Sequence, residues 1–145
     1  MPTSPLTDLT DAALRLAVKL NGSDMKEEYD IQSIQINHSI NKISFAELIL
    51  KGDVNIENGT MPITDGDDFN PGVEIEILAG YDGNELRSIF KGLIVKHIVE
   101  LSIESIFTFK ISCKHKAVKM TFNEQEKGVE NMTDSAIIKA IISTY

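Results

Sequence analysis

Three aspartates stand close together in one polar stretch, and their spacing raises the question of a metal site. Asp65, Asp67 and Asp68 lie in TDGDDFNPG, directly ahead of the alternating segment VEIEI. Counted from Asp65, Asp67 and Glu76 fall on the third and twelfth positions of an EF-hand calcium loop. The fifth, sixth and seventh positions hold Phe, Asn and Pro, and a strand pattern follows them. We therefore interpret the stretch as a solvated loop with Asx-turn character, with calcium binding as the alternative.

A histidine and a glutamate three positions apart form a second candidate metal motif. His97 and Glu100 make H-x-x-E, which can hold a metal when both side chains lie on one face of a helix. The surrounding sequence alternates with a period of two, so residues three apart project from opposite faces of a strand. His38 and His115 are equally isolated. We interpret all three histidines as hydrogen-bonded residues of a sheet.

Motifs that carry known catalytic chemistry are missing from the sequence. It contains no nucleophile elbow G-x-S-x-G, no H-E-x-x-H and no glycine-rich phosphate loop. A dispersed acid pair, Asp67 and Glu76, is the one enzymatic candidate worth testing. We predict that the chain is not an enzyme, that it has no catalytic, cofactor-binding or metal-binding residue, and that it needs no cofactor.

The single cysteine, Cys113, excludes an internal disulfide and any cysteine-rich metal site. It lies in phase with Phe107, Phe109 and Ile111, so on a strand its sulfur points to the same side as their side chains. This pattern predicts a buried structural thiol and not a nucleophile.

A basic cluster stands out in an otherwise acidic chain. Its members are Lys110, Lys114, His115, Lys116 and Lys119. Lys110 and Lys114 share the strand face opposite Cys113, and Lys116 joins them if the alternation continues. We favour the solvated face of an amphipathic strand. The alternative is a contact surface for an acidic partner or for an acidic patch on a second copy.

Composition restricts the class of protein. The chain has 145 residues, 42% of them hydrophobic and 25% charged, which is typical of one globular domain. The net charge of -8 argues against general nucleic-acid binding, because that binding depends on lysine and arginine neutralising phosphates. Charges interrupt every long apolar run, and the first residues have no signal-peptide pattern, so we expect no membrane insertion and export, if any, without a signal peptide.

Most of the chain shows the two-residue period of strands. Residues 1–11 are expected to be a flexible lead and residues 12–145 a single domain. We predict strands at residues 13–20, 29–40, 42–50, 71–81, 87–101 and 105–122. The second needs a bulge near Ser33, the third is apolar on both faces as if covered on each side, and residues 82–84 form a hairpin turn.

Only the C-terminal stretch changes its period. In TDSAIIKAIIS the isoleucines fall on one side of a helix that Thr133 or Asp134 can cap. The fold class is therefore mainly β, an antiparallel barrel-like or strongly curled sheet with one C-terminal α-helix. An apolar stripe that continues to the last residue suggests a fragment of a longer protein.

Four segments together resemble a known family. FNPGVEIEILAGYDG, IFKGLIVKH, CKHKAVKMTF and the TDSAIIKAII helix are similar to the N-terminal hub region of VgrG-type spike proteins. These proteins belong to type VI secretion and other contractile injection systems and share a fold with the phage late control D and tail-hub proteins. The resemblance covers about residues 12–145. Its most specific part is an F-x-P-G strand entry followed by an I-F-x-G-x-[IV] strand.

The resemblance implies a structural function. Such a hub module adapts a trimeric spike to the hexameric inner-tube protein (Hcp) and has no catalytic activity. It implies self-association as a trimer in full-length proteins, an Hcp-like partner, and assembly in the bacterial cytoplasm before the machine exports or injects the spike. The chain stops before the second barrel and the needle of the full pattern.

A small binding barrel of the OB type, for single-stranded nucleic acid or sugar, is the alternative function. It requires a groove with exposed aromatic and basic side chains. We expect Phe45, Phe90, Phe107 and Phe109 in the core, which would leave few aromatic rings for such a groove.

Overall fold

A computed structural model gives the architecture of the chain, and residues 13–53, 63, 66–81, 85–101, 106–124, 126, 128 and 130–144 are described. The seven strands are β1 (Leu14–Leu20), β2 (Ser23–Asp24), β3 (Asp30–Asn37), β4 (Phe45–Asp53), β5 (Glu74–Tyr81), β6 (Arg87–Leu101) and β7 (Ile106–His115). A 3-10 helix, η1 (Lys116–Thr121), and the helix α2 (Asp134–Ile142) follow. The predicted mainly-β class with one C-terminal α-helix is confirmed.

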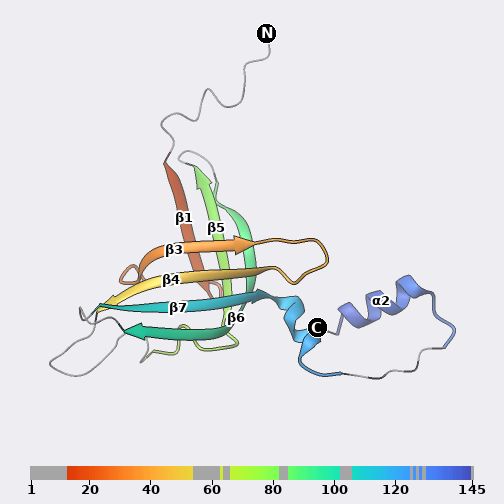
Figure 1. The fold of residues 1–145 in the computed structure, drawn as a ribbon. Coiled ribbons are helices and arrows are strands. Elements are labelled where there is room, and N and C mark those ends of the chain that lie inside the picture. The colour runs from red at the N-terminus through yellow and green to blue at the C-terminus, as the bar shows by residue number, and fades with distance from the viewer. Residues whose placement is uncertain are drawn as a thin grey trace, which may run out of the picture.

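All seven strands belong to one antiparallel sheet in the order β2-β1-β5-β6-β7-β4-β3. The sheet is not closed, so it is the curled form of the prediction and not a complete barrel. Figure 1 shows β1 and β5 crossing over the layer that β3, β4 and β7 form, with β6 bending from one group to the other. The apolar faces of the two groups thus meet inside the curl.

The long strand β6 makes this bend possible. Its first part pairs with β5 and its second part with β7, and Gly92 pairs with both Ile75 and His115. Shifts of register, one next to Ile77 and one next to Ile94, mark bulges on the two sides of the bend. A Cβ on Gly92 would collide with the backbone carbonyl of Lys114, so only glycine allows this approach.

A histidine ties the edge strand β3 back to β6. His38 follows β3, and its Nε2 lies 3.0 Å from the carbonyl oxygen of Ile89, while its Nδ1 lies 3.0 Å from Oγ of Ser44. The strands β7 and β4 separate β6 from β3 in the sheet order, so this hydrogen bond spans the curl. Ile89 is also the residue that the β5–β6 register skips. Both ring nitrogens of His38 are therefore used to hold the fold.

The core fills the inside of the curl. Phe107, Phe109 and Ile111 are fully buried there with Cys113, which is 1% exposed. Burial raises the pKa of the Cys113 thiol to about 12. The predicted burial of this thiol is confirmed. Phe90 is also buried, so three of the four phenylalanines expected in the core lie there.

The expectation that Phe45 lies in the core is wrong. Phe45 is 37% exposed because it points away from the core, opposite Ala46, and lies beside Lys114 on the outer face of the sheet. The neighbouring outer residues Glu47 and Ile49 are half-buried. The prediction that this strand is covered on both faces is therefore wrong.

The last predicted strand is shorter than expected. It ends at His115, whose Nδ1 accepts a hydrogen bond of 3.2 Å from the backbone N–H of Ala117 and so caps η1. Val118, on η1, is buried. Its burial favours the helical turn over a continued strand. Lys116 consequently leaves the lysine stripe that we predicted for it.

Two local predictions can be compared directly with the structure. The bulge expected near Ser33 is present, because the register with β4 shifts between Ile31 and Ser33. Thr133, one of the two predicted caps, is the N-cap residue of α2, but its side chain makes no capping hydrogen bond to the backbone, and its hydroxyl lies 3.3 Å from that of Ser135. Within the described ranges, no helix is long and apolar enough to cross a membrane. The predicted lead, Asp65 and the turn at 82–84 lie outside the described residues.

Candidate functional site

The loop that carries Asp67 and Asp68, just ahead of β5, is called the acidic loop. One of these aspartates fastens it to the rest of the fold. Asp68 accepts a 2.7 Å hydrogen bond from the hydroxyl of Tyr29, and Nζ of Lys26 lies 2.8 Å from the same carboxylate oxygen. The hydrogen bond from Lys26, and then that from Tyr29, hold the pKa of Asp68 below its ordinary value. The pKa of Lys26 is raised in turn by its hydrogen bond to Asp68. Asp68 is therefore an anchor of the loop.

An aromatic stack continues this anchor into the core. The ring of Phe69 lies 4.9 Å from that of Tyr29 and 5.7 Å from that of Phe109, both edge-on. His97 covers Phe109 at 5.3 Å, and its Nδ1 lies 3.2 Å from the carbonyl oxygen of Phe69. Burial is the main reason why the pKa of Tyr29 is raised. The loop is thus held to Tyr29, just ahead of β3, and to β6 and β7.

The other side chains that the sequence suggested as metal ligands or catalytic acids point in different directions. Asp67 accepts a 2.8 Å hydrogen bond from the side chain of Asn70 and closes a local turn. Glu76 lies on β5 with Nζ of Lys91 at 3.7 Å. Glu100 faces Lys110 at 3.3 Å on the outer side of β6, whereas His97 faces Phe109 on the inner side. Across the described residues, no three His, Cys, Asp or Glu side chains gather in a way that could hold a metal.

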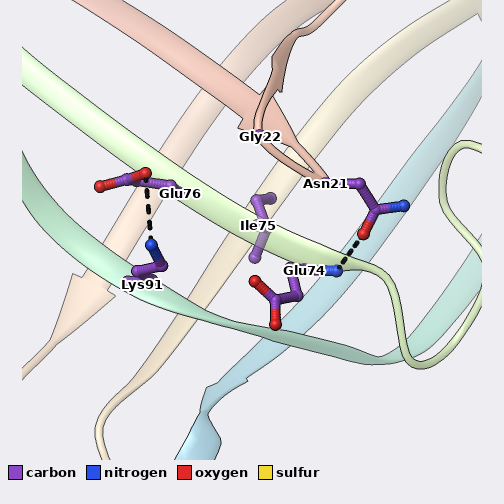
Figure 2. Close-up of a pocket in the computed structure, with 6 residues that line it drawn as sticks. All are labelled: Asn21, Gly22, Glu74, Ile75, Glu76 and Lys91. Atoms are coloured by element: carbon purple, nitrogen blue, oxygen red, sulfur yellow. Dashed lines mark hydrogen bonds and ion pairs between the residues drawn. The ribbon is translucent and has the colours of Figure 1, made fainter.

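A small hollow lies where the β1–β2 turn meets β5 and β6. It measures about 140 Å³, and its walls are Asn21, Gly22, Glu74, Ile75, Glu76 and Lys91 (Figure 2). Asn21 and Gly22 both have positive φ, which the Asn-Gly pair tolerates in a tight turn. Oδ1 of Asn21 accepts a 3.0 Å hydrogen bond from the backbone N–H of Glu74.

Both carboxylates of this hollow already have basic partners. Glu74 accepts a 2.6 Å hydrogen bond from Nζ of Lys116, which holds its pKa below the ordinary value. Lys116 comes from η1, so this pair attaches the 3-10 helix to β5, beside the buried Leu93 and Val118. The polar side chains around the hollow therefore connect the β1–β2 turn, β5, β6 and η1 to one another. Their ion pairs do not resemble a catalytic acid–base pair.

A basic surface covers the outer side of β4, β6 and β7. Lys110 pairs across the sheet with Ile49 and Ile98, and Lys114 pairs with Phe45 and Leu93. Lys51 of β4 and Lys96 of β6 lie on the same side of the sheet, in the cross-strand rows on either side of the Lys110 row. We call this surface the lysine face and define it by Phe45, Glu47, Ile49, Lys51, Lys96, Ile98, Glu100, Lys110 and Lys114. The sequence predicted the part formed by Lys110 and Lys114; Lys51 and Lys96 were missed because their alignment depends on strand pairing.

Solved structures share the fold, two tail proteins among them. One is the 43 kDa tail protein of prophage MuSo2 from Shewanella oneidensis, with a TM-score of 0.58, 14% identity, and coverage of 91% of this chain and 38% of that chain. The other is a tail protein from Neisseria meningitidis MC58, with a TM-score of 0.56, 15% identity, and coverage of 92% of this chain and 34% of that chain. The chain thus spans little more than a third of either protein.

The sequence comparisons give a family. The family described as the Alg8 N-terminal domain matches residues 10–145. No curated protein sequence matches the chain. Because the match includes nearly every residue, the chain belongs to the Alg8 N-terminal domain family.

Proposed function

We propose that this member of the Alg8 N-terminal domain family is a structural hub module of a contractile injection spike, similar to those of type VI secretion. The module would adapt a trimeric spike to a hexameric inner tube. The observation that carries the proposal is the fold, since a prophage tail protein and a second tail protein share it over 91% and 92% of this chain. The VgrG-like sequence segments point to the hub as the part of the tail.

The way in which loops and edges are fastened supports a mechanical role. The Lys26–Asp68–Tyr29 contacts hold the acidic loop, His38 holds the curl, and Lys116 holds η1 to β5. Each of these bonds joins segments that are far apart in sequence, so a load on one strand is passed to others. Among the described residues the polar side chains of these contacts serve one another and converge on no common ligand position.

The proposal includes partners and a place of action. The expected partners are further copies of the spike protein and an Hcp-like tube protein. Assembly would take place in the bacterial cytoplasm, and the machine itself would deliver the spike without a signal peptide. The OB-type alternative is the weaker one, because Phe90, Phe107 and Phe109 are buried and cannot stack on bases, which leaves Phe45 as the one of these four phenylalanines exposed beside lysines.

Co-assembly with the tube protein tests the function. The folded chain is mixed with the inner-tube protein of the same injection system, and complexes are isolated by size exclusion and imaged by electron microscopy. We expect the chain at the ends of tube rings. A Phe109→Ala variant, which loses a core ring, is the unfolded control. Failure of the folded chain to bind tube rings, with circular dichroism confirming its strands, would overturn the proposal.

A further inference from the structure

The lysine face combines charge with apolar side chains that lack cover. Along three paired strands it sets four lysines against two glutamates, although the whole chain has a net charge of -8. Between the lysines lie Phe45, which is 37% exposed, and the half-buried Ile49 and Ile98. A sheet surface of this kind suits a partner that presents apolar and acidic side chains together.

The C-terminal region of the same chain has the complementary character. Four exposed carboxylates precede or begin the helix: Glu124, Glu126, Glu130 and Asp134. Along α2, Ile138, Ile141 and Ile142 follow on the same side as Asp134 and are 56%, 48% and 59% exposed. No residue of α2 is buried. Figure 1 shows the helix beyond η1 and clear of the sheet.

We propose that α2 and the acidic residues ahead of it, from one copy of the chain, dock on the lysine face of a second copy. The isoleucines would cover Phe45, Ile49 and Ile98, while the carboxylates would meet Lys110 and Lys114, which lie beside these apolar residues on the middle strand β7. Each copy offers one helix and one face, so a reciprocal exchange satisfies both at once. The inference does not depend on the proposed tail function, because it follows from these two surfaces alone.

A second copy is the occupant that this arrangement favours. The helix of the same chain lies clear of its own sheet in Figure 1, and none of its residues is buried. The charges of the two surfaces are opposite, and opposite charges speed association and select the orientation of docking. Intramolecular docking and binding of nucleic acid by the lysines are the competing outcomes.

Analytical ultracentrifugation across about a hundredfold range of concentration tests the proposal. We expect a reversible dimer that weakens with added salt. Lys110→Glu with Lys114→Glu, and separately Ile138→Ser with Ile142→Ser, should each weaken the dimer by about tenfold or more. Lys19→Glu, a charge reversal on β1 outside the face, should leave the dimer unchanged. Circular dichroism confirms that each variant keeps the fold.

A charge exchange supplies the second measurement. Mixing the Lys110→Glu, Lys114→Glu variant with a Glu130→Lys, Asp134→Lys variant should restore association that the first variant lacks by itself. A monomer at all concentrations would overturn the proposal, as would a dimer indifferent to both sets of substitutions. Crosslinks from α2 to its own sheet in a monomer, or salt-sensitive binding of an oligonucleotide to the lysine face in place of dimerisation, would also overturn it.

Discussion

The hydroxyl of Tyr29 donates a 2.7 Å hydrogen bond to the carboxylate of Asp68, across 39 positions of sequence. Tyr29 is 6% exposed and precedes β3, whereas Asp68 belongs to the acidic loop that leads into β5. Lys26 neutralises the same carboxylate from outside at 2.8 Å. The acids that looked most like a metal site therefore include the residue that attaches the loop to the sheet.

Loss of this hydrogen bond should weaken the fold without abolishing it. Tyr29→Phe keeps the ring contact with Phe69 and removes only the hydroxyl, so we expect a loss of about 1 kcal/mol in the free energy of unfolding. Asp68→Asn should also destabilise, because it removes the charge that Lys26 faces. Urea denaturation measures both. Asp67→Asn, in the local turn with Asn70, is the control and should change stability less. Equal stability of Tyr29→Phe and wild type would contradict the role of the hydroxyl.

Acid should destabilise the protein through two named carboxylates. The pKa values of Asp68 and Glu74 are lowered in the folded state, chiefly by hydrogen bonds from Lys26 and Lys116 respectively. The folded state then binds fewer protons than the unfolded state, so their contribution is complete above the ordinary values of 3.8 and 4.5 and is lost as pH falls through the lowered folded values. The melting temperature of the double variant Asp68→Asn, Glu74→Gln should fall less steeply with decreasing pH than that of the wild type.

The matched control for this titration is Glu126→Gln, which removes an exposed carboxylate outside the sheet. It should retain the wild-type dependence on pH. If the double variant followed the wild-type curve throughout, the two ion pairs would not be the source of acid sensitivity.

Regular alternation explains which elements could be predicted from the sequence. Ile75 and Ile77 alternate with glutamates and are buried on β5 as expected, and an out-of-phase Ile31 indicated the bulge beside Ser33. Local period determines which side chains share a face. It does not determine which of two faces the rest of the chain covers, so Phe45 was misplaced.

The contacts of the candidate site depend on tertiary structure. Nothing near Asp68 in the sequence indicates Tyr29 or Lys26, since the curl of the sheet brings them together. Strand β7 ends because His115 caps η1 and Val118 is buried there, although Lys116 would continue the alternation of Lys110 and Lys114. Histidine followed two positions later by a small residue is too common a pattern to predict such a cap.

Calcium should have no effect on stability if the loop is fastened as described. One oxygen of Asp68, Oδ2, is engaged by both Lys26 and Tyr29, and Asp67 is turned toward Asn70. We therefore expect the melting temperature to be the same with calcium in millimolar excess and with a chelator. Magnesium at equal ionic strength controls for screening. A rise specific to calcium, lost in Asp67→Asn, would revive the metal-loop interpretation.

The bend of β6 should tolerate no side chain at Gly92. Gly92→Ala would place a Cβ against the backbone carbonyl of Lys114, which cannot move without separating β6 from β7. We expect a loss of at least about 2 kcal/mol in the free energy of unfolding, measured by urea denaturation. Gly128→Ala is the control, because a Cβ there meets nothing within 4 Å, and its effect should stay within about 0.5 kcal/mol. Similar stabilities for the two variants would show that the curl does not depend on this close approach.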